Sequence, residues 1–192
     1  MNYKQMVSRD FFLRDSPTLA RDLLGCTLET RIAGSYTSGR IVEVEAYRQE
    51  EPASHCYRGK TERNKAMFLN GGRLYVYFIY GMHHCVNIVA GREGYGEAVL
   101  LRGIEPVEGI EVMRERRGMK VGDCNLANGP GKLTRALGIG PEHNGLDLLT
   151  PDSPVKLLQG EPIPDSIVET TPRIGISKAT ELPWRWIVRT SQ

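Results

Sequence analysis

The chain has 192 residues and a net charge of +2, and 40% of its residues are hydrophobic and 25% charged. This is the composition of an ordinary globular protein, and the length suits one domain with a substantial core. No apolar run approaches the roughly 20 residues that span a bilayer, and residues 1–5 show no apolar signal core, so a soluble cytoplasmic protein is expected. The mildly basic charge permits a polyanionic partner without requiring one.

Short helices and strands are expected along the chain without the regular strand–helix alternation of a parallel sheet. Ser16 as N-cap, Pro17 at the first helical position and Gly25 beyond the end predict the first helix. The expected helices span 18–24, 61–69, 106–117 and 131–137. The expected strands span 26–32, 38–47, 74–80, 84–90, 98–103, 155–158, 173–176 and 186–189. Because neighbouring strands can pair through tight turns, we predict an α+β fold in a single domain, 1–192.

The second expected strand alternates regularly between its two faces. One face carries Ile41, Glu43, Glu45 and Tyr47, and the other, expected to be core, carries Val42, Val44 and Ala46. His55 follows after a short loop. A carboxylate beside an aromatic ring suits a general base acting on a flat, stacked substrate. The alternative is that Glu43 and Glu45 face water on an edge strand, where carboxylates are usually found.

The hairpin expected around residues 80–83 is unusually aromatic. Tyr75, Tyr77 and Ile79 share one face of its first strand, and Tyr80 lies beside Gly81 at the tip. A large ring at a rigid tip could wedge between stacked bases and replace one that has left the helix. The alternative is that Tyr80 folds back onto the sheet.

Two polar residues, Asn87 and Arg102, lie on the strands near this hairpin. Arg102 ends an otherwise apolar strand, where an unpaired buried cation would be very costly. We expect Glu45 to be its partner, because the pairing would orient the carboxylate and favour its charged form. The alternative is a surface arginine at a strand end.

Basic residues cluster at three places. They are Arg58, Lys60, Arg63 and Lys65 after His55; Arg114, Arg116, Arg117 and Lys120; and Lys132 with Arg135 beside Gly129-Pro130-Gly131. The first group suits phosphate contact because it follows the candidate site, whereas the second also suits a solvated helix end. The third could anchor a phosphate at a helix start, although Gly-Pro-Gly is also a common turn and the Walker spacing is absent.

Metal and nucleophile chemistry find little support. His55-Cys56 and His83-His84-Cys85 supply possible ligands, but adjacent strand residues point to opposite faces and no zinc spacing is present. The four cysteines lack a CxxC pair and are expected to be reduced thiols. No GxSxG motif occurs, and no lysine lies in an evident site for a Schiff base.

A set of short motifs occurs in order along most of the chain, from about residue 11 to 150. The motifs are Glu45-Ala46-Tyr47, His55, Thr61-Glu62-Arg63-Asn64, Met67-Phe68, Leu74-Tyr75-Val76-Tyr77, Tyr80-Gly81-Met82, Asn87, Leu100-Leu101-Arg102, Glu105-Pro106, Gly129-Pro130 and Lys132-Leu133. Together with Arg173-Ile174-Gly175-Ile176, they resemble the 3-methyladenine (alkyladenine) DNA glycosylase family. Each motif is modest, but this many in register is specific.

The resemblance implies roles for three groups of residues. Glu45 would activate water, and Arg102 would help to hold the carboxylate and the water. A flipped base would be enclosed by Tyr47, His55, Tyr77 and Asn87. The DNA surface would include Tyr80 as the intercalating wedge, flanked by Met82 and His83, with Arg63 and Lys132 as further contacts. We expect the consecutive histidines His83 and His84 to differ from the residues after this methionine in some relatives, which bears on lesion preference and not on the reaction.

The resemblance also implies a curved antiparallel sheet with a protruding hairpin and surrounding helices, and no metal or cofactor. The expected partner is double-stranded DNA with damaged purine bases, bound by a monomer in the cytoplasm, at the nucleoid if the source is bacterial. Hydrolysis without strand cleavage is expected. The alternatives are a non-catalytic nucleic-acid-binding module, for which the aromatic hairpin and basic loops suffice, and a metal-dependent hydrolase.

Overall fold

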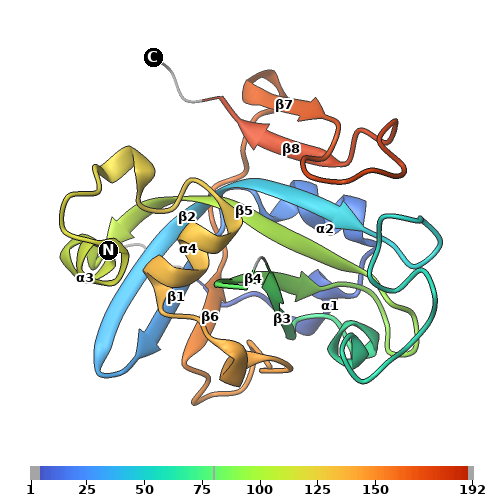
Figure 1. Ribbon diagram of the computed structural model, residues 1–192, viewed down its shortest axis with the longest axis horizontal. Helices are drawn as coiled ribbons and strands as arrows, with labels where there is room; N and C mark the ends of the chain where they lie inside the picture. The colour runs from blue at the N-terminus through green and yellow to red at the C-terminus, as the bar shows by residue number, and fades with distance from the viewer. Residues whose placement is uncertain (1–4, 80, 190–192) are drawn as a thin grey trace.

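One antiparallel sheet forms the centre of the computed structural model, which describes residues 5–79 and 81–189 (Figure 1). Its main path runs β3-β4-β5-β2-β1-β6, and β8 joins β2 and carries β7. The strands are β1 (Thr27–Ile32), β2 (Ser35–Tyr47), β3 (Leu74–Ile79), β4 (His83–Val89), β5 (Ala98–Glu108), β6 (Val155–Leu158), β7 (Val168–Thr171) and β8 (Arg185–Val188). The predicted α+β fold with a curved antiparallel sheet is confirmed.

The helices are short and surround the sheet. They are α1 (Arg9–Phe12), α2 (Ser16–Leu23), α3 (Ile110–Arg117) and α4 (Pro130–Leu137), with 3-10 turns η1 (Lys65–Phe68), η2 (Asp123–Asn125), η3 (Pro141–His143) and η4 (Asp165–Ile167). Helix α2 packs on β2 and β5, and α4 packs on β4, β5 and α3. Across the described ranges, no helix combines the length and apolarity needed to cross a membrane.

Helix α2 begins one residue earlier than its sequence suggests. Asp15, not Ser16, is the N-cap, and its carboxylate accepts the Thr18 N–H at 3.1 Å. The Ser16 backbone N–H instead donates to Glu97 at 2.7 Å. The expected cap was wrong because Asp and Ser suit an N-cap equally well. The choice between them depends on the contact of Ser16 with Glu97, which is 81 residues away in the sequence.

Strand β2 is an interior strand of the sheet over the part that carries Glu43 and Glu45. Its first part pairs with β1, its last part pairs with β8, and β5 runs along its other side. Glu43 and Glu45 each have a partner residue on β5 and on β8. The alternative of two water-facing carboxylates on an edge strand is therefore wrong.

The pairing of β2 with β5 shifts register between Ile41 and Glu43 and again between Glu43 and Val44. These irregularities interrupt the alternation that the sequence suggests. Ile41 is fully buried in the main core with Val44 and Ala46, so its expected place on the carboxylate face was wrong. On β5 the shift falls at Arg102, opposite the two carboxylates.

Two predicted helices are shorter in the structure. The helix expected over 61–69 is reduced to η1, because the Asn64 side chain binds the Thr61 N–H and the carbonyl of His55 and so stabilises a turn. The helix expected from Pro106 starts only at Ile110. Strand β5 continues to Glu108, and Gly109 reverses the chain in the left-handed region at φ 73°.

The C-terminal part of the chain and the hairpin show three further differences from the expected elements. The strand expected at 173–176 is irregular, because the Arg173 side chain is anchored in the interior and carries its backbone with it. Strand β7 was not expected, since its sequence Val-Glu-Thr-Thr gives only a weak signal. In the hairpin, β4 already begins at His83, which the sequence assigned to the turn.

Candidate active site

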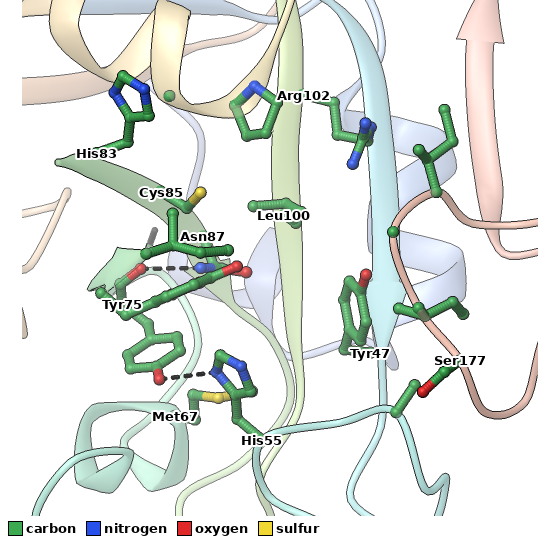
Figure 2. A pocket seen from close by; sticks show the side chains of 18 of the residues that line it. Tyr47, His55, Met67, Tyr75, His83, Cys85, Asn87, Leu100, Arg102 and Ser177 are labelled. Atoms are coloured by element: carbon green, nitrogen blue, oxygen red, sulfur yellow. Dashed lines mark hydrogen bonds between the residues drawn. The ribbon is translucent and has the colours of Figure 1, made fainter. Parts of the chain in front are cut away.

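A cavity of about 570 Å³ opens on the carboxylate side of β2. Its walls come from the end of β2 and the loop after it, η1, the hairpin strands β3 and β4, β5, the start of α4 and the segment 174–178 (Figure 2). The volume lies within the range of about 300–1,000 Å³ typical of small-molecule sites. The fold thus brings six distant stretches of chain to one hollow.

Most of the predicted site residues meet in this cavity. It is lined by Tyr47, His55, Tyr77, Asn87, Arg102 and, at its edge, His83. They come from strands β2, β3, β4 and β5 and from the loop after β2. The alternation on β3 placed Tyr77 correctly, and Ile79 lines the cavity on the same face.

One wall of the cavity is aromatic. The Tyr75 and Tyr77 rings are stacked with centroids 5.4 Å apart, and the His55 ring meets Tyr77 edge-on at 4.7 Å. The Tyr75 hydroxyl and His55 Nδ1 share a hydrogen bond of 3.0 Å. Tyr47 lies across the hollow from this group (Figure 2). Such facing rings suit a flat ligand that stacks between them.

The aromatic groups are neutral at ordinary pH. Burial raises the pKa of Tyr77 and Tyr47, the latter helped by the neighbouring Glu45 charge, and raises the pKa of Tyr75 to about 12. Desolvation of the ring by the surrounding residues, and then the Arg63 charge, lowers the pKa of His55. The wall therefore carries no charge of its own.

Glu45 lies behind the wall rather than in it, and its side chain is 0% exposed. Its Oε1 accepts the Ile174 N–H at 2.7 Å. Its Oε2 accepts the Tyr47 hydroxyl at 2.8 Å and Arg102 Nη1 at 3.3 Å. Three donors facing two oxygens match the acceptor-only character of a carboxylate. All three donor residues also line the cavity, so Glu45 is one side chain away from a bound ligand.

The predicted pairing of Arg102 with Glu45 is confirmed, and it belongs to a longer chain of charges. Arg102 Nε also donates to Glu43 Oε1 at 3.0 Å, and Arg185 Nε donates to the same oxygen at 2.7 Å. Burial alone would lower the pKa of Arg102, but the carboxylates of Glu45 and Glu43 outweigh it and raise the pKa. The two arginines balance the two carboxylates within this part of the sheet.

Asn87 and Cys85 complete the back of the cavity. Asn87 is 4% exposed, and its Nδ2 donates to the Tyr75 carbonyl at 3.0 Å, which fixes the orientation of its amide. Cys85 is buried on β4, and burial raises the pKa of its thiol. A protonated thiol is a poor nucleophile, so Cys85 is not activated for attack.

The residues predicted to touch DNA differ in exposure within the described part of the chain. Arg63 is exposed and Met82 is 72% exposed at the end of the hairpin. His83 lies between the cavity and a second hollow of about 340 Å³ beside α4. Lys132 is half-buried, and its Nζ donates to Asn128 at 2.8 Å. Tyr80, the predicted wedge, lies outside the described residues.

The basic group at the end of α3 has a structural role in part. Arg116 Nη1 donates to the Ala136 carbonyl at 3.1 Å, and Arg117 Nε donates to the Leu126 carbonyl at 3.0 Å. These bonds connect α3 to α4 and to the loop that precedes α4. Lys120, by contrast, is exposed.

Sequence reasoning missed the wall formed by 174–178, which includes Ile174 and Lys178. The sequence analysis expected a strand at 173–176 and noted the resemblance of this stretch to a family motif, but it assigned these residues no role at the site. Lys178 lines the cavity with an exposed side chain, and the expectation that no lysine is placed to form a Schiff base stays a prediction. Tyr75 was also missed, although it shares its face with Tyr77 and the alternation of β3 could have identified it.

Within residues 5–79 and 81–189, the structure contains no group of three or more His, Cys, Asp or Glu side chains that could hold a metal ion. His55-Cys56 and His83-His84-Cys85 therefore do not come together into a set of donors in this part of the chain.

Comparisons with known proteins agree on one family. A family model described as methylpurine-DNA glycosylase (MPG) matches residues 10–192. A protein of Methanoculleus marisnigri is 50% identical over 189 residues, covering 95% of this chain and 94% of its own. A protein of Carboxydothermus hydrogenoformans is 44% identical with 97% of both chains covered, and one of Chlorobaculum tepidum is 48% identical with 92% and 84% covered. Each of the three bears the name "Putative 3-methyladenine DNA glycosylase".

Proposed function

Because the chain belongs to the methylpurine-DNA glycosylase family, we propose that it removes alkylated purines, such as 3-methyladenine, from double-stranded DNA. It hydrolyses the N-glycosidic bond and leaves an abasic site. One observation carries this proposal: uncharged aromatic walls enclose a hollow directly in front of the buried carboxylate of Glu45. A flat base and a reacting sugar need those two features together.

The substrate base must leave the duplex to reach the cavity, at a cost of a few kcal/mol. Stacking of the base on Tyr47 and Tyr77 returns roughly 1–3 kcal/mol. An alkylated purine is cationic, so the electron-rich faces of these rings attract it more strongly than they attract a normal base. Tyr80 fills the gap left in the duplex, a role inferred from its place in the sequence, and the exposed Met82 lies beside that gap.

Bond cleavage then passes through an oxocarbenium-like sugar, as in glycoside hydrolysis. The negative charge of Glu45 stabilises that cation, and the carboxylate takes a proton from the attacking water. Arg102 orients Glu45 through the contact of 3.3 Å. A base that is already cationic leaves without a general acid, so one carboxylate suffices.

Water must approach Glu45 Oε2, where the Tyr47 hydroxyl now donates at 2.8 Å. We propose that the incoming base, by stacking on the Tyr47 ring, moves this hydroxyl aside and opens the oxygen to water. The shielding matters because bulk water would screen the charge of an exposed carboxylate and weaken its stabilisation of the sugar cation. Glu45 thus acts only when the cavity is filled.

Two features separate this proposal from its alternatives. A non-catalytic nucleic-acid-binding module gives Glu45 no reason to lie, fully buried, behind a stacking pocket. A bifunctional enzyme would need a nucleophilic amine, and amines of that kind are usually desolvated. Lys178 lines the cavity, but its side chain is exposed. We therefore propose hydrolysis with the sugar–phosphate backbone left intact.

The test is incubation of the purified protein with methylated duplex DNA, followed by chromatography of released free purines. We expect 3-methyladenine in the soluble fraction and abasic sites in intact strands. Excess chelator should leave the yield unchanged, whereas loss of activity would favour a metal-dependent hydrolase. Tight DNA binding without any released base would favour the binding module.

A further inference from the structure

We infer that the buried ion pair between Arg173 and Glu51 is a positioning element of this active site, holding the Tyr47 ring and the Ile174 amide in place. The inference rests on the proposed function for the reaction that it supports. Neither member of the pair lines the cavity, so neither is a catalytic residue. Their effect on base release must pass through the groups that they hold.

The pair is bidentate and closed to solvent. Arg173 Nη1 lies 2.6 Å from Glu51 Oε1, and Nη2 lies 3.0 Å from Oε2. The side chains of Arg173 and Glu51 are 0% and 4% exposed. Burying two charges is costly, and such pairs are often no more stabilising than apolar residues of similar size. A specific geometric role is therefore a better reason for the pair than stability.

The guanidinium joins three parts of the chain. Nη1 donates to the Ala46 carbonyl at 2.9 Å, between the two functional residues of β2, and Nη2 donates to the Ala179 carbonyl at 3.3 Å. Glu51 adds the loop that leads to His55. The cation also lies 4.6 Å from the centroid of the Tyr47 ring and 5.4 Å from that of Trp184. Arg173 thereby supports Tyr47, which stacks on the base.

The second effect reaches Glu45 through the backbone. The Ile174 amide follows Arg173 directly and donates to Glu45 Oε1 at 2.7 Å. Ile174 itself is 50% exposed, and Gly175, Ser177 and Lys178 are also exposed. The anchored Arg173 side chain is thus the interior attachment of a stretch that otherwise lies on the surface. Without it, the amide would lose the support that fixes its distance from the carboxylate.

The test replaces both charges, because removing one alone would leave the other buried and unpaired. In the double variant Glu51→Leu/Arg173→Met, we expect base release by saturating enzyme to fall about tenfold to 100-fold, the scale of a small misplacement of catalytic groups. The affinity for DNA containing an abasic site should change less than about threefold. A change of rate without a change of binding is the signature of positioning.

The matched control is Arg9→Met/Asp147→Leu. This pair, 2.6 Å apart, also ties distant segments but lies away from the cavity. We expect its release rate to stay within about threefold of wild type. An equal fall in the control, or a wild-type rate in a folded Glu51→Leu/Arg173→Met variant, would overturn the inference.

A third variant covers the case in which the double variant does not fold. Arg173→Lys keeps the charge but cannot span both Glu51 oxygens and two carbonyls, so we expect a loss of rate at normal DNA affinity. A wild-type rate in Arg173→Lys would also count against positioning. Failure of the proposed function would look different, since wild-type protein itself would then release no base.

Discussion

The Arg102 guanidinium binds Glu45, with Nη1 3.3 Å from Oε2, at the point where the pairing of β2 with β5 shifts register. The shift lets an arginine from β5 reach a carboxylate on β2 within the same sheet. Arg102 also binds Glu43, which makes one cation the common partner of two acids. The irregular pairing thus brings Arg102, which lines the cavity, into contact with both carboxylates.

Replacing the carboxylate should stop the reaction while keeping the site. In Glu45→Gln, we expect base release to fall about 10²–10⁴-fold, the range for loss of a general base, with DNA affinity nearly unchanged. Single-turnover release of 3-methyladenine measures the rate, and a gel-shift assay measures binding. Glu43→Gln is the matched control, because Glu43 shares the Arg102 contact but accepts neither the Tyr47 hydroxyl nor the Ile174 N–H. A wild-type rate in Glu45→Gln would refute the assigned role.

The Tyr47 hydroxyl is predicted to cover Glu45 rather than to act on the substrate. In Tyr47→Phe the stacking ring remains and Oε2 loses only the donor at 2.8 Å. We expect the release rate to stay within about threefold of wild type. Tyr47→Ala, which removes the ring, should lose about 1–3 kcal/mol of stacking. If Tyr47→Phe were as slow as Tyr47→Ala, the hydroxyl would have a direct part in catalysis.

The two faces of β3 offer a direct comparison of pocket and surface. Tyr77 lines the cavity, whereas the next residue, Phe78, points to the other face and is 52% exposed. We expect Tyr77→Ala to weaken binding of a flipped base about 5- to 150-fold, and Tyr77→Phe to restore it. Phe78→Ala should leave release unchanged. Equal effects of the two alanine variants would indicate general damage to the hairpin.

Tyr80 is predicted from sequence to hold the gap in the duplex. Tyr80→Ala should therefore slow release from duplex DNA by about tenfold, equivalent to about 1.4 kcal/mol of lost support for the flipped state. Release from single-stranded DNA, where no gap has to be filled, should change little. Phe78→Ala, which removes an exposed ring from the other face of the same hairpin, is the control. Equal slowing on both substrates would remove the wedge from the mechanism.

Local alternation predicted those parts of the site that lie on regular strand. Tyr77 lines the cavity as its position on β3 indicated, because side chains alternate strictly between the faces of a strand. Ile41 was misplaced because the bulge in β2 depends on the strand that pairs with it. A single strand's sequence carries no record of its partner's register.

Contacts between distant segments could not be predicted in the same way. Arg173 and Glu51 are 122 residues apart, and neither lies in a periodic element. The Ile174 amide that binds Glu45 is a backbone group, so its role leaves no residue type to recognise. The sequence signalled the chemical groups of the site, whereas the fold decided which backbone would meet them.

Glu97 provides a test of stability that is separate from catalysis. Its side chain lies in the interior, 5% exposed, and burial raises the pKa of its carboxyl above the ordinary value of 4.5. Between 4.5 and the raised pKa, the folded protein binds more protons than the unfolded chain, so stability falls as the pH rises through that window.

Glu97→Gln removes this titration and can still accept the Ser16 N–H. We expect its melting temperature, relative to wild type, to be higher at pH 7 than at pH 4.5. Glu93→Gln, at an exposed position nearby, controls for the loss of one charge. A difference from wild type that does not grow between pH 4.5 and 7 would show that the buried carboxylate costs the fold nothing.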